Sequence, residues 1–148
     1  PDGFYKGKTL EMIVGYAPGS SNDIAARALA RTIGKYLPGN PNVVTRNMPG
    51  GGSFVAANYI FNVAPKDGTV LGLMAPTIPI DEKLGSDGVK FKTSQFNWIG
   101  TVQGTNTNLY VWSKIGVKTI EDAKKREVVI GATGAGGGAE IYPALMVR

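Results

Sequence analysis

The first part of the chain opens with a short apolar segment followed by a longer segment with a helical repeat. Residues 9–16 are apolar and partly alternating, and they end at an Ala-Pro-Gly turn, which is typical of a buried strand. Ser20 and Asp23 then match a capping box, and apolar residues recur at helical spacing over residues 24–36 until a Pro-Gly pair. The pattern therefore predicts a strand and then a helix.

The same alternation of a short apolar segment and a helical segment repeats once more, and a third short segment follows. Residues 42–46 form a short apolar segment, residues 54–64 have a helical pattern that ends at Pro65, and residues 69–75 form a third short segment after an Asp-Gly turn. Strand, helix, strand, helix and strand at this spacing indicate parallel strands joined by right-handed crossovers. We therefore expect an α/β fold whose parallel-core sheet has flanking helices.

The pattern becomes less regular after the third segment. Residues 76–95 are rich in Pro and Gly and indicate a loop, and a polar stretch separates the apolar runs at 96–102 and 108–112. The aromatic residues of these runs are interpreted as strand core or cleft wall: Trp98, Tyr110 and Trp112.

The last part of the chain predicts two helix starts with a strand between them. Thr119 and Asp122 match a second capping box, residues 128–132 indicate a strand, and residues 139–148 indicate the beginning of a further helix. Because nothing there marks a helix end, the pattern suggests an architecture that should continue.

The composition excludes several classes of chemistry. The 148 residues suffice for one domain or two very small ones, and they include no Cys and no His. A Ser-His-Asp triad, a thiolate nucleophile and a zinc site built on Cys or His are therefore excluded. The adjacent acid pairs Asp81-Glu82 and Glu121-Asp122 do not face each other on a helix. We expect no enzyme activity, no cofactor and no metal.

The charge of +5 favours anionic partners, but the basic residues are scattered except at residues 124–126. No stripe of aromatic residues accompanies that cluster, so we expect no nucleic-acid partner. No apolar stretch is long enough to span a membrane.

Three glycine-rich turns follow predicted strands and open predicted helices, at residues 17–22, 48–53 and 133–138. Helix starts carry backbone N–H groups without intrahelical partners, and glycine lets a ligand approach the backbone closely. The turns thus indicate an anion-binding cleft, although each could also be a simple connection. Asp23 has two possible roles, which are compatible with each other. It can be a structural cap that locks its turn, and it can accept from an ammonium or hydroxyl group of a ligand.

A dinucleotide site is the rival interpretation of the third turn. Residues 134–139 fit G-x-G-x-x-[GA] after the strand predicted at 128–132, but an acid about 20 residues later cannot be tested because nine residues follow. The phosphate-binding loop motif G-x-x-x-x-G-K-[ST] does not occur. The alternative function is therefore a dinucleotide-binding α/β domain of an oxidoreductase.

Five motifs in order resemble those of the Bug-type solute receptors of tripartite tricarboxylate transporters. They are VGYAPGSSNDIAAR at 14–27, NMPGGG at 47–52, APKDGTVL at 64–71, FNWIG at 96–100 and GATGAGGGAEIYP at 131–143. The chain departs from the family pattern at Gly15, Ser20, Met48 and Lys66.

The resemblance implies a type II periplasmic binding protein architecture with two lobes. Residues 1–102 would be a nearly complete first lobe that lacks its return segment, residues 103–115 the crossover or hinge, and residues 116–148 the start of a truncated second lobe. Because two full lobes need about twice this length, the chain could also associate with a second copy of itself to cover apolar surface.

The resemblance also implies a ligand site, in which backbone amides and bridging waters hold a carboxylate. The implied contacts are Ala17, Gly19, Ser20, Ser21 and Asp23 from the first lobe and Thr133, Gly134, Ala135, Gly136 and Gly138 from the second, with Thr77 as a further cleft contact. The expected function is capture of a small organic carboxylate (a dicarboxylate, a tricarboxylate, an aromatic acid or an acidic amino acid) in the periplasm and its delivery to a membrane permease.

Overall fold

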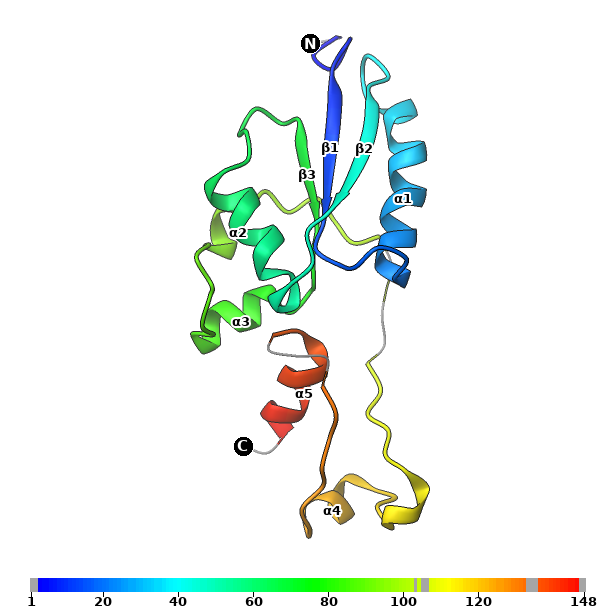
Figure 1. Ribbon diagram of the computed structural model, residues 1–148, viewed down its shortest axis with the longest axis vertical. Helices are drawn as coiled ribbons and strands as arrows, with labels where there is room; N and C mark the ends of the chain where they lie inside the picture. Colours follow the sequence, from blue (N-terminus) through cyan, green and yellow to red (C-terminus); the bar gives the residue numbers. More distant parts are fainter. Residues whose placement is uncertain (1–2, 103, 105–106, 133–135, 147–148) are drawn as a thin grey trace.

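A three-stranded parallel sheet forms the centre of the molecule. The computed structural model describes residues 3–102, 104, 107–132 and 136–146. Strands β1 (Thr9–Val14), β2 (Asn42–Asn47) and β3 (Val70–Leu73) are arranged in the order β2-β1-β3 (Figure 1). Met12 of β1 pairs with Thr45 on one side and with Leu71 on the other. The predicted α/β fold with parallel strands is confirmed, and the first and third strands are shorter than expected.

Two helices cover the sheet. Helix α1 (Ser21–Ile33), followed by a 3₁₀ turn at Gly34–Tyr36, connects β1 to β2, and α2 (Phe54–Asn62) connects β2 to β3. Figure 1 shows the two helices on opposite sides of the sheet, as right-handed crossovers in opposite directions require. Both predicted helices are therefore present.

The central strand is buried on both faces, as a sheet covered on both sides requires. Met12 and Val14 pack against Ala26 and Ala30 of α1, and Ile13, which points to the other face, is also fully buried. A second cluster of buried side chains contains Phe54 and Ala57 of α2 together with Ala75, Ile78 and Phe91.

The prediction of a loop over residues 76–95 is wrong in part. Helix α3 (Ile78–Leu84) lies within it, and a 3₁₀ turn follows at Thr93–Gln95. Pro79 lies in the first helical turn, where its missing N–H costs no helical hydrogen bond. Gly85 ends the helix in the left-handed conformation with φ of 69°. Pro79 and Gly85, two of the Pro and Gly residues that indicated a loop, thus mark the two ends of a helix.

Residues 107–132 are mostly irregular. They contain a 3₁₀ turn at Ser113–Ile115 and the short helix α4 (Ile120–Ala123), and residues 128–132 do not form the predicted strand. Trp98, Tyr110 and Trp112 are 58%, 89% and 69% exposed, so their interpretation as strand core is wrong. The physical reason is that strand residues become core only against a neighbouring strand, and the three strands that the structure describes leave none for these segments.

The chain returns to the sheet region through helix α5 (Gly138–Met146), which confirms the helix predicted from residue 139. Ile141 of α5 is buried, and the helix begins below α2 and α3 in Figure 1. Of the helices in the described residues, none combines the length and the apolar character that crossing a membrane requires.

Candidate functional site

The first glycine-rich turn joins the carboxyl end of β1 to the start of α1. Ser20 is the N-cap residue, and its Oγ accepts a hydrogen bond from the N–H of Asp23 at 3.2 Å. The backbone N–H of Ile24 donates to the carbonyl of Ser20 at 2.9 Å, which begins the helical ladder. Ligands of open α/β sheets bind beyond the carboxyl ends of the strands, where this helix begins.

The carboxylate of Asp23 holds this turn in place. Its Oδ2 accepts from the N–H of Gly19 at 2.8 Å and from Nε of Arg27 at 3.0 Å, and its Oδ1 accepts from Nδ2 of Asn47 at 2.8 Å. These hydrogen bonds, that of Arg27 first, lower the pKa of Asp23 to about 2. The predicted capping box is thus modified, because Asp23 reaches back to Gly19 and not to the N–H of Ser20. With both oxygens bound to protein groups, the geometry favours the locking role over a direct contact with ligand.

Arg27 and Asn47 extend the network from the turn to the edge strand β2. Arg27 donates to Oγ1 of Thr45 and to Oδ1 of Asn47, both at 2.9 Å, and Asn47 also donates to the carbonyl of Tyr16 at 3.0 Å. The sequence analysis assigned a locking role to Asp23 but assigned no role to Thr45 or Asn47. Thr45 and Asn47 alternate on one face of a short strand, and Asn47 also begins the NMPGGG motif, but neither pattern names a partner for these side chains.

Ser53 ties the second glycine-rich turn to the ends of β1 and β3. Its Oγ donates to the carbonyl of Gly15 at 3.0 Å and accepts from the N–H of Ala75 at 3.1 Å, and its side chain is buried. A Cβ added to Gly15 would lie 2.5 Å from this Oγ, so only glycine fits there. The departure from the family pattern at Gly15 therefore has a packing reason.

This arrangement decides which groups at the start of α1 can meet a ligand. The N–H of Gly19 already donates to Asp23, and a side chain at Gly19 would meet no atom within 4 Å. Because Oγ of Ser20 acts as an acceptor within the cap, its O–H hydrogen can donate elsewhere. Together with the N–H of Ser21 at the first helical position, Ser20 offers donors at the positive end of the helix dipole. Ala17 belongs to the same turn.

The third glycine-rich turn lies against the second one. A Cβ added to Gly136 would be 3.0 Å from the carbonyl oxygen of Gly51 and 3.1 Å from the ring of Phe54. A Cβ added to Gly138 would be 3.8 Å from Cγ2 of Thr77. The structure thus brings the predicted residues Gly136, Gly138 and Thr77 into one junction. The other three predicted contacts of this turn, Thr133, Gly134 and Ala135, lie outside the described residues.

Asp81 lies in the same junction and was not predicted as a site residue. It is fully buried on α3, while the neighbouring Glu82 turns away and accepts from the N–H of Thr93 at 2.8 Å. Burial raises the pKa of Asp81, and the nearby charge of Glu140 on α5 raises it further. The bonds to Thr93 lower the pKa of Glu82 instead. No signal in the sequence distinguished these two adjacent acids.

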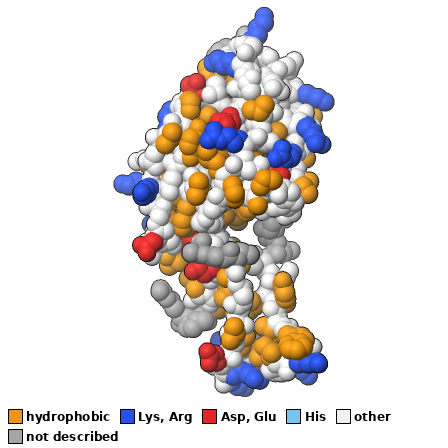
Figure 2. All heavy atoms as spheres, viewed as in Figure 1, with side chains coloured by type: hydrophobic (Ala, Val, Ile, Leu, Met, Phe, Trp, Pro, Cys, Tyr) orange, Lys and Arg blue, Asp and Glu red, His pale blue; other side chains and the backbone are white. Residues whose placement is uncertain are grey.

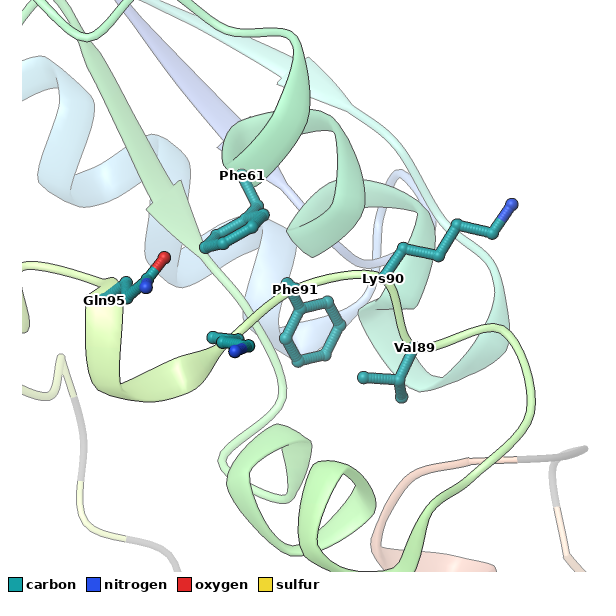
Figure 3. Close-up of a pocket in the computed structure, with 6 residues that line it drawn as sticks. Phe61, Val89, Lys90, Phe91 and Gln95 are labelled. Atoms are coloured by element: carbon teal, nitrogen blue, oxygen red, sulfur yellow. The ribbon is translucent and has the colours of Figure 1, made fainter.

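A shallow hollow of about 490 Å³ lies elsewhere, between α2 and the segment that follows α3. Figure 3 shows the rings of Phe61 and Phe91 at this hollow, with the ammonium group of Lys90 directed away from it. None of the predicted site residues lines it. Within the described residues, no three acidic side chains gather closely enough to hold a metal ion.

Charge is spread over the surface. Figure 2 shows Lys and Arg side chains distributed over the visible face, with apolar side chains exposed at the end of the molecule that carries α4. The net charge of +5 is therefore not concentrated in one basic patch on this face.

Comparison with known proteins gives one informative similarity. The chain is 30% identical over 117 residues to the "UPF0065 protein in gbd 5'region" of Cupriavidus necator. The aligned part covers 78% of this chain and 34% of that protein, so the chain spans about a third of the length of the curated relative it matches. No family model and no solved structure matches the chain. The chain is thus similar, over most of its length, to part of a UPF0065 protein.

Proposed function

We propose that the chain is part of a non-catalytic periplasmic receptor of the Bug type, which captures a small organic carboxylate for a tripartite tricarboxylate transporter. UPF0065 is the family that includes the Bug-type receptors, so the similarity and the five ordered motifs favour the same function. In this proposal the sheet region and the segment from residue 116 are parts of the two lobes of a type II binding fold, and a membrane permease receives the ligand.

The observation that carries the proposal is the locked start of α1. Asp23, Arg27 and Asn47 fix the turn at the carboxyl end of β1 without using the hydroxyl proton of Ser20. The helix start therefore presents oriented donors, which suit the oxygens of a carboxylate. A rigid donor set of this kind binds an anion without needing basic side chains at the site.

The dinucleotide alternative is not favoured. The G-x-G-x-x-[GA] motif requires a strand immediately before its first glycine, and residues 128–132 are not a strand. Without that strand, the motif lacks the structural context that would support it.

A thermal-shift screen tests the proposal. The chain is heated with dicarboxylates, tricarboxylates, aromatic acids and acidic amino acids, and with dinucleotides as controls. A ligand at 100 times its dissociation constant adds about 2.7 kcal/mol of stability, which raises the unfolding midpoint by several degrees. We expect a shift with one class of carboxylate, whereas a shift with dinucleotides alone would contradict the proposal.

A matched pair of variants localises the site. Ser20→Ala and Thr119→Ala each remove an N-cap hydroxyl, at α1 and at α4. We expect Ser20→Ala to weaken carboxylate binding and Thr119→Ala to leave it unchanged. Equal effects of the two substitutions would show that the start of α1 is not the site.

A further inference from the structure

The chain contains Asp-Gly pairs at residues 2–3, 67–68 and 87–88. Glycine has no side chain to shield its backbone nitrogen, so in such a pair that nitrogen can reach the carboxyl group of the preceding aspartate. Residue 2 lies outside the described residues, and the structure therefore compares Asp67 with Asp87. Both are exposed, and Gly68 and Gly88 have similar φ angles of 81° and 87°. The two pairs differ in how their carboxylates are held.

The carboxylate of Asp67 is tied to the start of β3. Its Oδ1 accepts from the N–H of Thr69 at 3.0 Å and from Oγ1 of Thr69 at 2.6 Å. These bonds lower the pKa of Asp67, so the protonated carboxyl group is scarcer than usual. Tyr5 also donates to the carbonyl of Gly68 at 3.3 Å. Hydrogen bonds thus restrain both residues of this pair.

Asp87 lies at the tip of a tight turn that follows α3. The N–H of Val89 donates to the carbonyl of Ser86 at 3.3 Å, which places Asp87 and Gly88 at the two central positions of the turn. Within the described residues, the carboxylate of Asp87 accepts no hydrogen bond and joins no ion pair. This carboxylate is therefore free to rotate toward the nitrogen of Gly88.

We propose that Asp87 is a site of isoaspartate formation in the folded chain and that the hydrogen bonds of Asp67 protect the matching pair. The nitrogen of Gly88 bonds to Cγ of the protonated Asp87 carboxyl group, whose hydroxyl leaves with the amide proton as water, and a succinimide ring results. Water then adds to one of the two ring carbonyl carbons and breaks its bond to nitrogen. Cleavage at Cγ restores aspartate, and cleavage at the main-chain carbonyl gives isoaspartate. This inference does not depend on the proposed function.

The product would change a segment that is fixed to α2. Asn58 donates to the carbonyl of Gly88 and accepts from the N–H of Lys90, both at 2.8 Å. The next residue, Phe91, is buried in the cluster that contains Phe54. In isoaspartate the main chain runs through Cβ and Cγ and is one carbon atom longer. We therefore expect the modification to shift the turn relative to Asn58 and to loosen the packing of Phe91.

Ageing of the folded chain near neutral pH tests the site. An isoaspartyl methyltransferase with labelled S-adenosylmethionine marks only the isoaspartyl form, and peptide mapping assigns the label to a residue. We expect label to accumulate at Asp87 about fivefold faster or more than at Asp67, because the hydrogen bonds of Asp67 must break first. In urea the two rates should become similar. Equal rates in the folded chain, or a difference that persists in urea, would overturn the proposal.

Two variants distinguish the causes. Thr69→Val removes the hydroxyl donor of Asp67 and keeps the N–H donor, so it should speed isoaspartate formation at Asp67 and leave the rate at Asp87 unchanged. An unchanged rate at Asp67 would contradict its protection by hydrogen bonds.

Asp87→Glu changes an exposed residue, and its longer side chain does not close the same ring. Ageing should lower the thermal unfolding midpoint of the unchanged chain more than that of this variant. Equal losses would overturn the expected effect on the fold.

Discussion

Helices α1 and α4 begin with the same local signal but differ in how they are held. Ser20 and Thr119 are both N-cap residues whose side chains accept from the N–H three residues later. At α4 the acid of the box, Asp122, accepts from the backbone N–H groups of its near neighbours Lys118 and Thr119. At α1 the acid of the box bonds to Arg27 and to Asn47, which is 24 residues away.

The difference teaches that a capping box starts a helix but does not make a rigid site. The box of α4 is exposed, and its helix is four residues long. The box of α1 is joined to β2 and lies next to a buried sheet, so its donors keep a fixed direction. Rigidity of this kind reduces the entropic cost of binding, which is why we assign the carboxylate to α1.

The largest effect is expected from removing the hydroxyl that joins the two strand ends. Ser53→Ala leaves the carbonyl of Gly15 and the N–H of Ala75 buried without a partner, which costs about 3 kcal/mol in the free energy of unfolding. Ser113→Ala, at an exposed serine in the irregular region, should change it by about 0.5 kcal/mol or less. Urea denaturation measures the free energy of unfolding of both variants. Similar losses for Ser53→Ala and Ser113→Ala would contradict the difference between the sheet region and the irregular region.

A smaller effect is expected from the two N-cap variants. Ser20→Ala should lower the free energy of unfolding by about 1 kcal/mol, the usual cost of a lost cap. Thr119→Ala should change the global midpoint less, because α4 is short and exposed and can open locally. Thermal unfolding followed by circular dichroism distinguishes the two. A larger loss for Thr119→Ala would show that the irregular region contributes more to stability than the sheet side does.

The smallest effect concerns pH. The pKa of Asp23 is about 2 in the folded chain and 3.8 in an ordinary environment, so its stabilisation is present above 3.8 and is lost as the pH falls toward 2. The pKa of Asp122 is also lowered, by the N–H groups of Lys118 and Thr119. We expect a carbon-detected titration to give the lower pKa for Asp23. In addition, Asp23→Asn should reduce the loss of stability between pH 4 and pH 2, and an Asp23 pKa near 3.8 would contradict the network.

The regular elements of the sheet region could be predicted because their signals are local. Apolar alternation predicted β1, β2 and β3, and the capping residues predicted the starts of α1 and α4. Proline and glycine gave a wrong prediction at α3, because Pro79 and Gly85 mark the ends of a helix and not a loop. The apolar run at 128–132 predicts a strand, but a strand also requires a neighbouring strand, which the sequence period does not report.

The candidate site was predicted only as far as its signals were local. The turn at residues 17–22 and the role of Asp23 follow from glycine and capping patterns in one short stretch. Asn47, Ser53 and Asp81 act through contacts between segments that are distant in the sequence. Asn47 and Ser53 lie at a motif and a glycine-rich turn that the sequence shows, but the partners of all three residues are known only from the fold.

The most direct test of the central claim is a nitrogen–proton correlation spectrum of the labelled chain during titration with the carboxylate that gives the largest thermal shift. The account predicts that the amide signals of Ser20 and Ser21 move most, with smaller changes at Gly136 and Gly138. The signals of Ile120 and Glu121 at the start of α4 should not move. Changes centred on α4, or on the hollow between Phe61 and Phe91, would contradict the assignment of the ligand site to the start of α1.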